Sequence, residues 1–165
     1  MSDACILKTV PPRYAACRFD NYAPRNEKQR EAKRVLHGAA LDDHWLRGGS
    51  VILCGPPGVG KTHLAVAYLL DIADDLVCLH NIPELQATAE LVFAAHRDLV
   101  RRLAEDAGYA ERLAKRTLLL IDDLEEPATP REAAALAELI DRRYQRIGSG
   151  GVRMAVTTNL TLREL

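Results

Sequence analysis

The sequence predicts an α/β fold with three layers, in which a parallel sheet is covered by helices on both faces. Short apolar strands alternate along the chain with amphipathic helical stretches, which is the pattern of crossover-connected parallel strands. A glycine-rich segment follows the first of these strands directly, at the edge of a parallel sheet where ligands bind. A chain of 165 residues is long enough for one domain with a buried core.

Composition excludes several classes of protein. Apolar residues make up 48%, charged residues 27%, and the formal net charge is −1, so any contact with DNA must come from a local patch. We find no secretion signal and no run near the ~18 apolar residues that a membrane span needs, and we expect a cytoplasmic protein without membrane contact. The four cysteines form no C-x-x-C and the five histidines no H-x-x-x-H, which favours reduced thiols and no protein-built metal site.

The N-terminal half is predicted to hold an arm and the first helices and strand of the core. Residues 1–25 form an irregular, Pro-punctuated arm, and residues 26–165 form the α/β core. The expected elements are a helix over about Glu27–Leu41 opened by an Asn26–Gln29 capping box, a fully apolar strand over Ser50–Cys54 of the kind buried on both faces, and a helix over about Lys61–Ala73 that repeats Leu64, Tyr68 and Ile72.

The C-terminal half is predicted to alternate in the same way after a segment, residues 74–89, that looks inserted and whose structure stays open. The expected elements are a strand over Leu91–Ala95, a helix over residues 97–103, a short helix around Tyr109–Lys115, a strand over Thr117–Ile121, a helix that starts with Thr129 and Pro130, buries Leu136, Ile140, Tyr144 and Ile147 and stops at Gly148, and a last strand over Val152–Thr158.

The glycine-rich segment matches the phosphate-binding pattern G-x-x-x-x-G-K-[ST] without a mismatch. Its backbone N–H groups are expected to surround the phosphates, while Lys61 faces the β and γ phosphates and Thr62 ligates Mg²⁺. The pattern lies between a predicted strand and a predicted helix, which makes it specific. The residues assigned to nucleotide binding are Gly55, Pro56, Pro57, Gly58, Val59, Gly60, Lys61, Thr62 and His63.

Polar residues at the ends of two later strands complete the predicted site. Asp122 follows four apolar residues and is expected to hold Mg²⁺ through its water shell, and Asp123 to orient or activate the attacking water. Asn159 ends the last strand and is placed next to the γ phosphate, where it positions the water. We therefore assign catalytic roles to Lys61, Asp123 and Asn159, with ATP and Mg²⁺ as cofactors.

The chain lacks the motifs of several other P-loop proteins. It has neither an N-K-x-D guanine motif nor an L-S-G-G-Q transporter motif, and the acid pair favours water over a small-molecule acceptor. An ATPase that converts hydrolysis into conformational work is the preferred class. A nucleotide-binding assembly module with little hydrolysis and a small P-loop kinase stay as alternatives.

With these motifs in order, the sequence resembles the AAA+ ATPases of the DnaC-type bacterial helicase loaders and the related IstB-type transposition helpers. The matching stretches are RFDNY at 18–22, CGPPGVGKTHLAVAYLL at 54–70, RDLVRRL at 97–103, LLLIDDL at 118–124, IDRRYQ at 140–145 and VTTNLTLREL at 156–165.

The resemblance implies a P-loop core of the AAA+ or RecA-like type. It makes Lys61 and Thr62 the Walker A residues, Asp122 and Asp123 Walker B and Asn159 sensor 1, and it places the N-terminal arm near the adenine with Tyr14 or Phe19 in contact, although these aromatic residues equally suit a role in packing the arm. Compared with the family, the sequence stops just after sensor 1, before the arginine finger and sensor 2. At most weak ATP hydrolysis is therefore expected from the chain alone.

The resemblance also implies partners in DNA replication. We expect a replicative helicase, or alternatively a transposase, together with nucleotide-dependent self-assembly. Single-stranded DNA is expected at Arg97, Arg101 and Arg102, which the i, i+4, i+5 spacing allows to share one helix face. The nearby acids Asp98, Glu105 and Asp106 suit a solvated face equally well.

Overall fold

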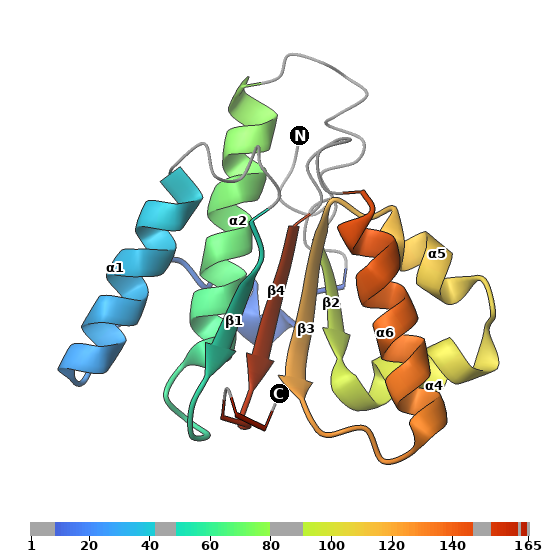
Figure 1. Cartoon of the computed structure of the whole chain (residues 1–165). Helices are drawn as coiled ribbons and strands as arrows, with labels where there is room; N and C mark the ends of the chain where they lie inside the picture. The colour runs from blue at the N-terminus through green and yellow to red at the C-terminus, as the bar shows by residue number, and fades with distance from the viewer. Residues whose placement is uncertain (1–8, 42–48, 80–90, 147–152, 162, 165) are drawn as a thin grey trace.

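The structure is a computed structural model that describes residues 9–41, 49–79, 91–146, 153–161 and 163–164. Its centre is a sheet of four strands, β1 (Val51–Cys54), β2 (Leu91–Ala95), β3 (Leu118–Leu124) and β4 (Arg153–Thr158). They lie in the order β1-β4-β3-β2 and every pair is parallel, so the carboxyl ends of all strands share one edge (Figure 1).

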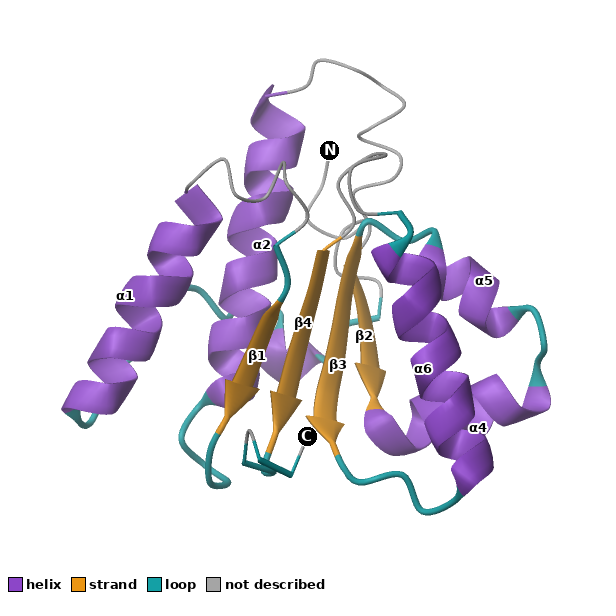
Figure 2. Cartoon of the chain, viewed as in Figure 1, coloured by secondary structure: helices purple, strands orange, loops and turns teal. Residues whose placement is uncertain are grey.

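Helices cover both faces of this sheet, as the sequence predicts (Figure 2). One layer holds α1 (Glu27–Leu41), α2 (Lys61–Leu79) and the arm with its short 3-10 turn η1 (Pro12–Tyr14), and the other holds α4 (His96–Glu105), α5 (Tyr109–Ala114) and α6 (Pro130–Tyr144). Strand β3 serves both layers, because Leu118 and Leu120 pack toward α2 whereas Leu119 and Ile121 pack toward α4 and α6. Among the described residues, no helix combines the length and apolar character needed to cross a membrane.

Helix starts follow the capping residues that the sequence indicates. The N–H of Gln29 donates to Oδ1 of Asn26 over 2.9 Å, and the N–H of Glu132 donates to Oγ1 of Thr129 over 3.2 Å. Each bond satisfies one of the N–H groups that a helix leaves unpaired at its first turn. Leu64, Tyr68 and Ile72 of α2 are all buried, as predicted.

Two elements extend at least three residues beyond their predicted ends. Helix α2 continues to Leu79, so residues 74–79 extend it and do not belong to an insertion; residues 80–89 lie outside the described residues. Strand β3 continues to Leu124, which places Asp122 and Asp123 within the strand.

The prediction that the first strand is buried on both faces is wrong. Strand β1 pairs with β4 alone among the described strands, and its residues alternate between half-buried and exposed, with Ile52 54% exposed. An edge strand and a central strand can have the same apolar composition, so composition did not distinguish them.

The buried face predicted for the helix from Pro130 is also wrong in phase. Helix α6 buries Leu136, Leu139 and Arg143, whereas Ile140 and Tyr144 are 46% and 71% exposed. The helix ends at Tyr144, before the predicted stop at Gly148, and Ile147 and Gly148 lie outside the described residues. Arg143 belongs to the buried face, but an arginine is not expected there because charged side chains are rarely buried without partners. The apolar residues alone therefore indicate a different face of the helix.

Candidate nucleotide-binding site

The predicted site residues converge at the carboxyl edge of the sheet. The glycine loop follows β1, Asp122 and Asp123 lie in β3 just before its end at Leu124, and Asn159 follows β4. A cavity of about 390 Å³ lies between these three strand ends. Its lining includes Gly58, Gly60, Lys61, Thr62, His63, Asp122, Asp123 and Asn159.

The loop backbone needs glycine at two positions. Gly58 has φ +78° and Gly60 has φ +90°, a region that other residues rarely adopt. A Cβ added to Gly60 would also lie 2.6 Å from Cε2 of Tyr22. Helix α2 begins directly after this loop, and the Leu64 N–H donates to the Gly60 carbonyl over 3.0 Å. A glycine loop followed directly by a helix offers backbone N–H groups and the positive end of the helix dipole to an anion.

Lys61 connects the loop to the end of β4. Its Nζ donates to the carbonyls of Gly55 and Pro56 over 2.7 and 2.9 Å, and to Oδ1 of Asn159 over 2.8 Å. Burial lowers the pKa of Lys61 below its ordinary value, and the carboxylates of Asp123 and Asp122 offset part of that effect.

The two aspartates lie at a bulge in β3. The register of β3 against β4 shifts between Ile121 and Leu124, and Asp123 has φ +56°, an unusual value that aspartate tolerates better than most residues. Asp122 is 8% exposed and accepts a 2.7 Å hydrogen bond from Oγ1 of Thr157, which itself accepts from the Asp123 N–H over 2.9 Å. Thr157 thus fixes both acids from the neighbouring strand.

Asn159 contacts Asp123 as well as Lys61. Its Nδ2 donates to Oδ1 of Asp123 over 2.9 Å. The cation of the glycine loop, the amide at the end of β4 and the second acid of β3 are therefore joined by hydrogen bonds, although they are far apart in the sequence.

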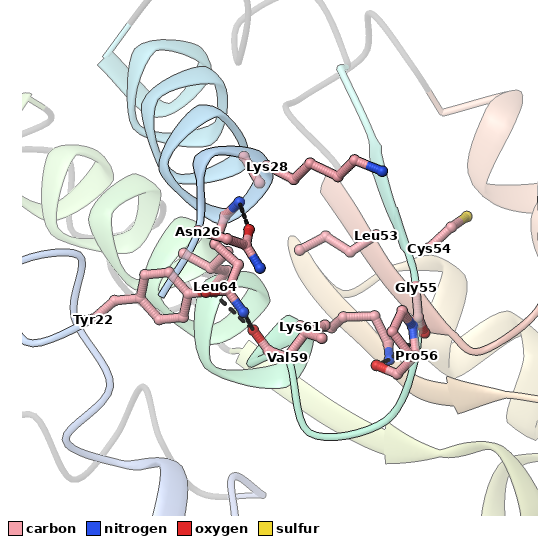
Figure 3. A pocket seen from close by; sticks show the side chains of 12 residues that line it. Tyr22, Asn26, Lys28, Leu53, Cys54, Gly55, Pro56, Val59, Lys61 and Leu64 are labelled. Atoms are coloured by element: carbon pink, nitrogen blue, oxygen red, sulfur yellow. Dashed lines mark hydrogen bonds between the residues drawn. The ribbon is translucent and has the colours of Figure 1, made fainter. Parts of the chain in front are cut away.

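A second pocket of about 400 Å³ lies on the other side of the glycine loop (Figure 3). Its apolar walls come from Ala32, Leu53 and Leu64, and the Tyr22 ring closes one side, where its hydroxyl donates to the Val59 carbonyl over 2.8 Å. Asn26, Lys28 and Gln29 of the α1 start add polar groups. A mostly apolar lining with a few polar groups suits a nucleobase.

The arm residues lie differently from the adenine contacts that the resemblance implies. Phe19 is 3% exposed within the core, and Tyr14 stacks on Phe93 with ring centroids 5.9 Å apart. Tyr22 is the arm residue that lines the apolar pocket. His63 packs against Tyr22 at 5.2 Å, and its Nε2 lies 3.0 Å from the carbonyl of Arg18, so it ties α2 to the arm.

The donor set at the phosphate side suits Mg²⁺ bound together with phosphate. The Thr62 hydroxyl and the Asp122 carboxylate line the same cavity, and both are oxygen ligands. Within the described ranges no cluster of three or more His, Cys, Asp or Glu residues could hold a metal ion. A bound cation would therefore need phosphate or water oxygens beside these two side chains.

The three arginines predicted for DNA differ in their surroundings. Arg97 pairs with Glu125 at 3.4 Å, and Arg101 pairs with Asp98 and Glu105, each at 3.1 Å. Arg102 lies over the ring of Tyr109 at 5.8 Å and has no carboxylate partner among the described residues. The structure thus separates Arg102 from the other two.

Sequence reasoning missed three residues of this region: Arg13, Tyr22 and Thr157. Tyr22 and Arg13 come from the arm and reach the loop only through the fold. Thr157 could have been found from the side-chain alternation along VTT, because it lies beside Asp122 on the same face of the neighbouring strand and donates to it.

These features define a P-loop nucleotide-binding core of the AAA+ type. The profile of the IstB-like ATP-binding protein family matches residues 13–165, and the chain belongs to this family. The IS21 insertion-sequence ATP-binding protein of Pseudomonas aeruginosa is 32% identical over 71% of the chain, and that of IS5376 from Geobacillus stearothermophilus is 27% identical over 84%. The chain spans 41% and 52% of the lengths of these two relatives.

Solved structures give the same fold. The DnaC helicase loader superposes with a TM-score of 0.71 at 26% identity, covering 92% of this chain and 81% of that one. DnaI, at 18% identity and a TM-score of 0.67, shares the fold over 94% of this chain and 79% of its own. The fold class and the IstB/DnaC resemblance predicted from the sequence are confirmed.

Proposed function

We propose that the chain binds ATP with Mg²⁺ at the edge of the sheet and hydrolyses it slowly to ADP and phosphate. The observation that carries the proposal is the hydrogen-bonded series Lys61–Asn159–Asp123 beside a glycine loop with positive φ angles. In this arrangement Lys61 holds the β and γ phosphates, Asn159 senses the γ phosphate, and Asp123 orients the attacking water. Thr62 and Asp122 supply the protein oxygens for Mg²⁺, and the base enters the pocket beside Tyr22.

Binding of Mg²⁺–ATP to the parent and to Lys61→Ala tests this proposal. The variant loses a charge-assisted contact worth ~1.5–3 kcal/mol, so its affinity falls by roughly ten- to more than a hundredfold. Lys115→Ala is the matched control, because Lys115 lies at the C-terminal end of α5, pairs with Glu111 at the surface and lines neither pocket of the site. Equal affinities for the parent and Lys61→Ala would remove the site assignment.

We further propose that this ATPase acts with a DNA-handling partner, either a replicative helicase or a transposase, and that ATP promotes its self-assembly. The similarity to DnaC supports the first partner, and the insertion-sequence relatives support the second with equal weight. Co-purification with each candidate in ATP, compared with Lys61→Ala, separates them. Binding of one partner that the variant loses identifies it, whereas binding of neither contradicts the proposed role.

For single-stranded DNA, the proposal centres on Arg102. Arg97 and Arg101 have acidic partners that bound phosphate would have to displace, whereas Arg102 lies over an aromatic ring that a base could join. Arg102→Ala should weaken binding of an oligonucleotide more than Arg97→Ala does, and lower its salt dependence. Equal effects of the two substitutions would contradict this assignment.

A further inference from the structure

We propose that Arg13, in the N-terminal arm, contacts the terminal phosphate of the ATP that the same chain binds. The inference rests on the nucleotide site proposed above and adds a residue to it. No pattern in the glycine loop or the strand ends points to this arginine, because it lies more than a whole helix and strand earlier in the chain.

Arg13 lies at the phosphate end of the site. It belongs to η1 and lines the same cavity as Lys61, Thr62, Asp122, Asp123 and Asn159. The base pocket on the other side of the glycine loop is lined by a different arm residue, Tyr22. Arg13 also borders a neighbouring cavity of about 480 Å³ between the end of β2 and α4, which shares Asp122 with the phosphate cavity. Its position is therefore on the Asp122 side, where the outer end of the phosphate chain is expected.

The arm that carries Arg13 is fixed to the sheet. Oγ1 of Thr9 donates to the Leu91 carbonyl over 3.1 Å and accepts from the Phe93 N–H over 2.7 Å, so the arm follows β2. The Tyr14 ring then stacks on Phe93, and the guanidinium of Arg13 lies 4.7 Å from the centre of the Tyr14 ring. The ring holds the guanidinium from one side and leaves its N–H groups available to an anion. Because the side chain is already restrained, binding an anion costs little further side-chain entropy.

The charge of Arg13 has no acidic partner in the part of the chain that the structure describes. Among the described residues no carboxylate lies within ion-pair distance of it, whereas Arg97 and Arg101 on α4 both have acidic partners. The guanidinium is also exposed, and a planar fork of N–H donors matches phosphate oxygens well. An unpaired arginine held at the wall of a phosphate cavity is best explained by an anion that enters that cavity.

The competing explanation is that Arg13 only packs on Tyr14. The two explanations differ in what they require of the side chain, because packing needs the aliphatic stem whereas phosphate binding needs the charge. Arg13→Met keeps an unbranched apolar stem over the ring and removes the charge. Arg13→Lys keeps both stem and charge but loses the fork.

The experiment measures the affinities of Mg²⁺–ATP and Mg²⁺–ADP for the parent, Arg13→Met, Arg13→Lys and the control Arg34→Met. Arg34 is an exposed arginine of α1 paired with Glu31, outside both pockets. We expect Arg13→Met to lower the affinity for ATP about tenfold and the affinity for ADP less than about twofold. The ATP affinity of Arg13→Lys should lie in between, and the control should keep both affinities of the parent.

Each other outcome decides against the inference. If Arg13→Met loses affinity equally for ATP and ADP, the arm acts through packing alone. The same conclusion follows if Arg13→Met lowers the melting temperature while Arg13→Lys has the parent's affinity for both nucleotides. Unchanged affinities in Arg13→Met would show that Arg13 does not touch the nucleotide. If the parent itself binds neither nucleotide, the proposed function fails first, and Lys61→Ala would then match the parent.

Discussion

The side-chain amide of Asn159, directly after β4, donates a 2.9 Å hydrogen bond to the carboxylate of Asp123 in β3. The same side chain accepts from Lys61 through its oxygen. Asn159 therefore contacts both the group that would hold the γ phosphate and the group that would handle water. Lys61 and Asp123 are thus linked through Asn159, which would carry a movement of Lys61 at the phosphate to the second acid.

The first prediction follows from this contact. Asp123→Asn is expected to bind ATP as the parent does and to lose turnover, because an amide cannot accept the proton of the attacking water. Asparagine also tolerates the φ of +56° found at this position, so the substitution adds little backbone strain. Phosphate release and nucleotide affinity, measured on the same samples, check both halves. Parent-like phosphate release would remove Asp123 from catalysis.

A second prediction concerns the close approach of Tyr22 to Gly60. Gly60→Ala puts a methyl group 2.6 Å from the Tyr22 ring at a φ of +90°, which costs ~1–3 kcal/mol in loop strain and should reduce ATP affinity about tenfold or more.

Gly38→Ala is the matched control for this loop glycine. Gly38 lies in the interior of α1, and a Cβ there meets nothing within 4 Å. The control should gain about 0.5–1 kcal/mol in the free energy of unfolding and keep its affinity for ATP. Similar affinity in Gly60→Ala and Gly38→Ala would contradict the tight packing of the glycine loop.

Cys54 offers a third prediction, because it has an exposed thiol, directly precedes the glycine loop and is among the residues that line the pocket proposed for the base. In a background with Cys5 and Cys78 changed to serine, a thiol reagent should modify Cys54, and saturating Mg²⁺–ATP should slow the reaction in proportion to the bound fraction. Cys17 is buried, and burial raises the pKa of its thiol, so it should react slowly in either condition. A reaction rate at Cys54 that ATP does not change would place the nucleotide elsewhere.

The strand ends explain why much of this site was predictable. Lys61, Asp122 and Asn159 belong to motifs whose strands are parallel, and parallel strands bring their carboxyl ends to one edge wherever the strands lie in the order. Neither strand order nor the path of the arm follows from local pattern. The base pocket at Tyr22 and the placement of Arg13 depend on how residues 9–25 cross the sheet, which the sequence left open.

The same reasoning accounts for the errors outside the site. Helical period gives the existence of α6 but not its phase when one position in the buried stripe is an arginine. The exposed Ile52 lies in β1, which pairs with β4 alone among the described strands, and an apolar tetrapeptide does not reveal this position. Both are decided by contacts between elements distant in the chain.

The last prediction tests that buried arginine. Arg143 is 3% exposed, and its guanidinium donates to the carbonyls of Leu113 at 2.9 Å, Arg116 at 2.8 Å and Arg153 at 2.5 Å, which joins α6 to the α5–β3 connection and to β4.

Arg143→Met removes the guanidinium from these carbonyls, and the Leu113 carbonyl keeps another donor, the Arg116 N–H at 3.1 Å. Each buried group left unsatisfied costs ~1–3 kcal/mol, so the free energy of unfolding should fall by about 2 kcal/mol or more. Arg142→Met, one residue earlier, removes only surface ion pairs to Glu138 and Glu111 and should cost within about 1 kcal/mol. Urea unfolding of both variants gives the comparison. Equal midpoints for the two would mean that the carbonyls bond to water when the guanidinium is gone, and that Arg143 does not hold α6 to the α5–β3 connection and to β4.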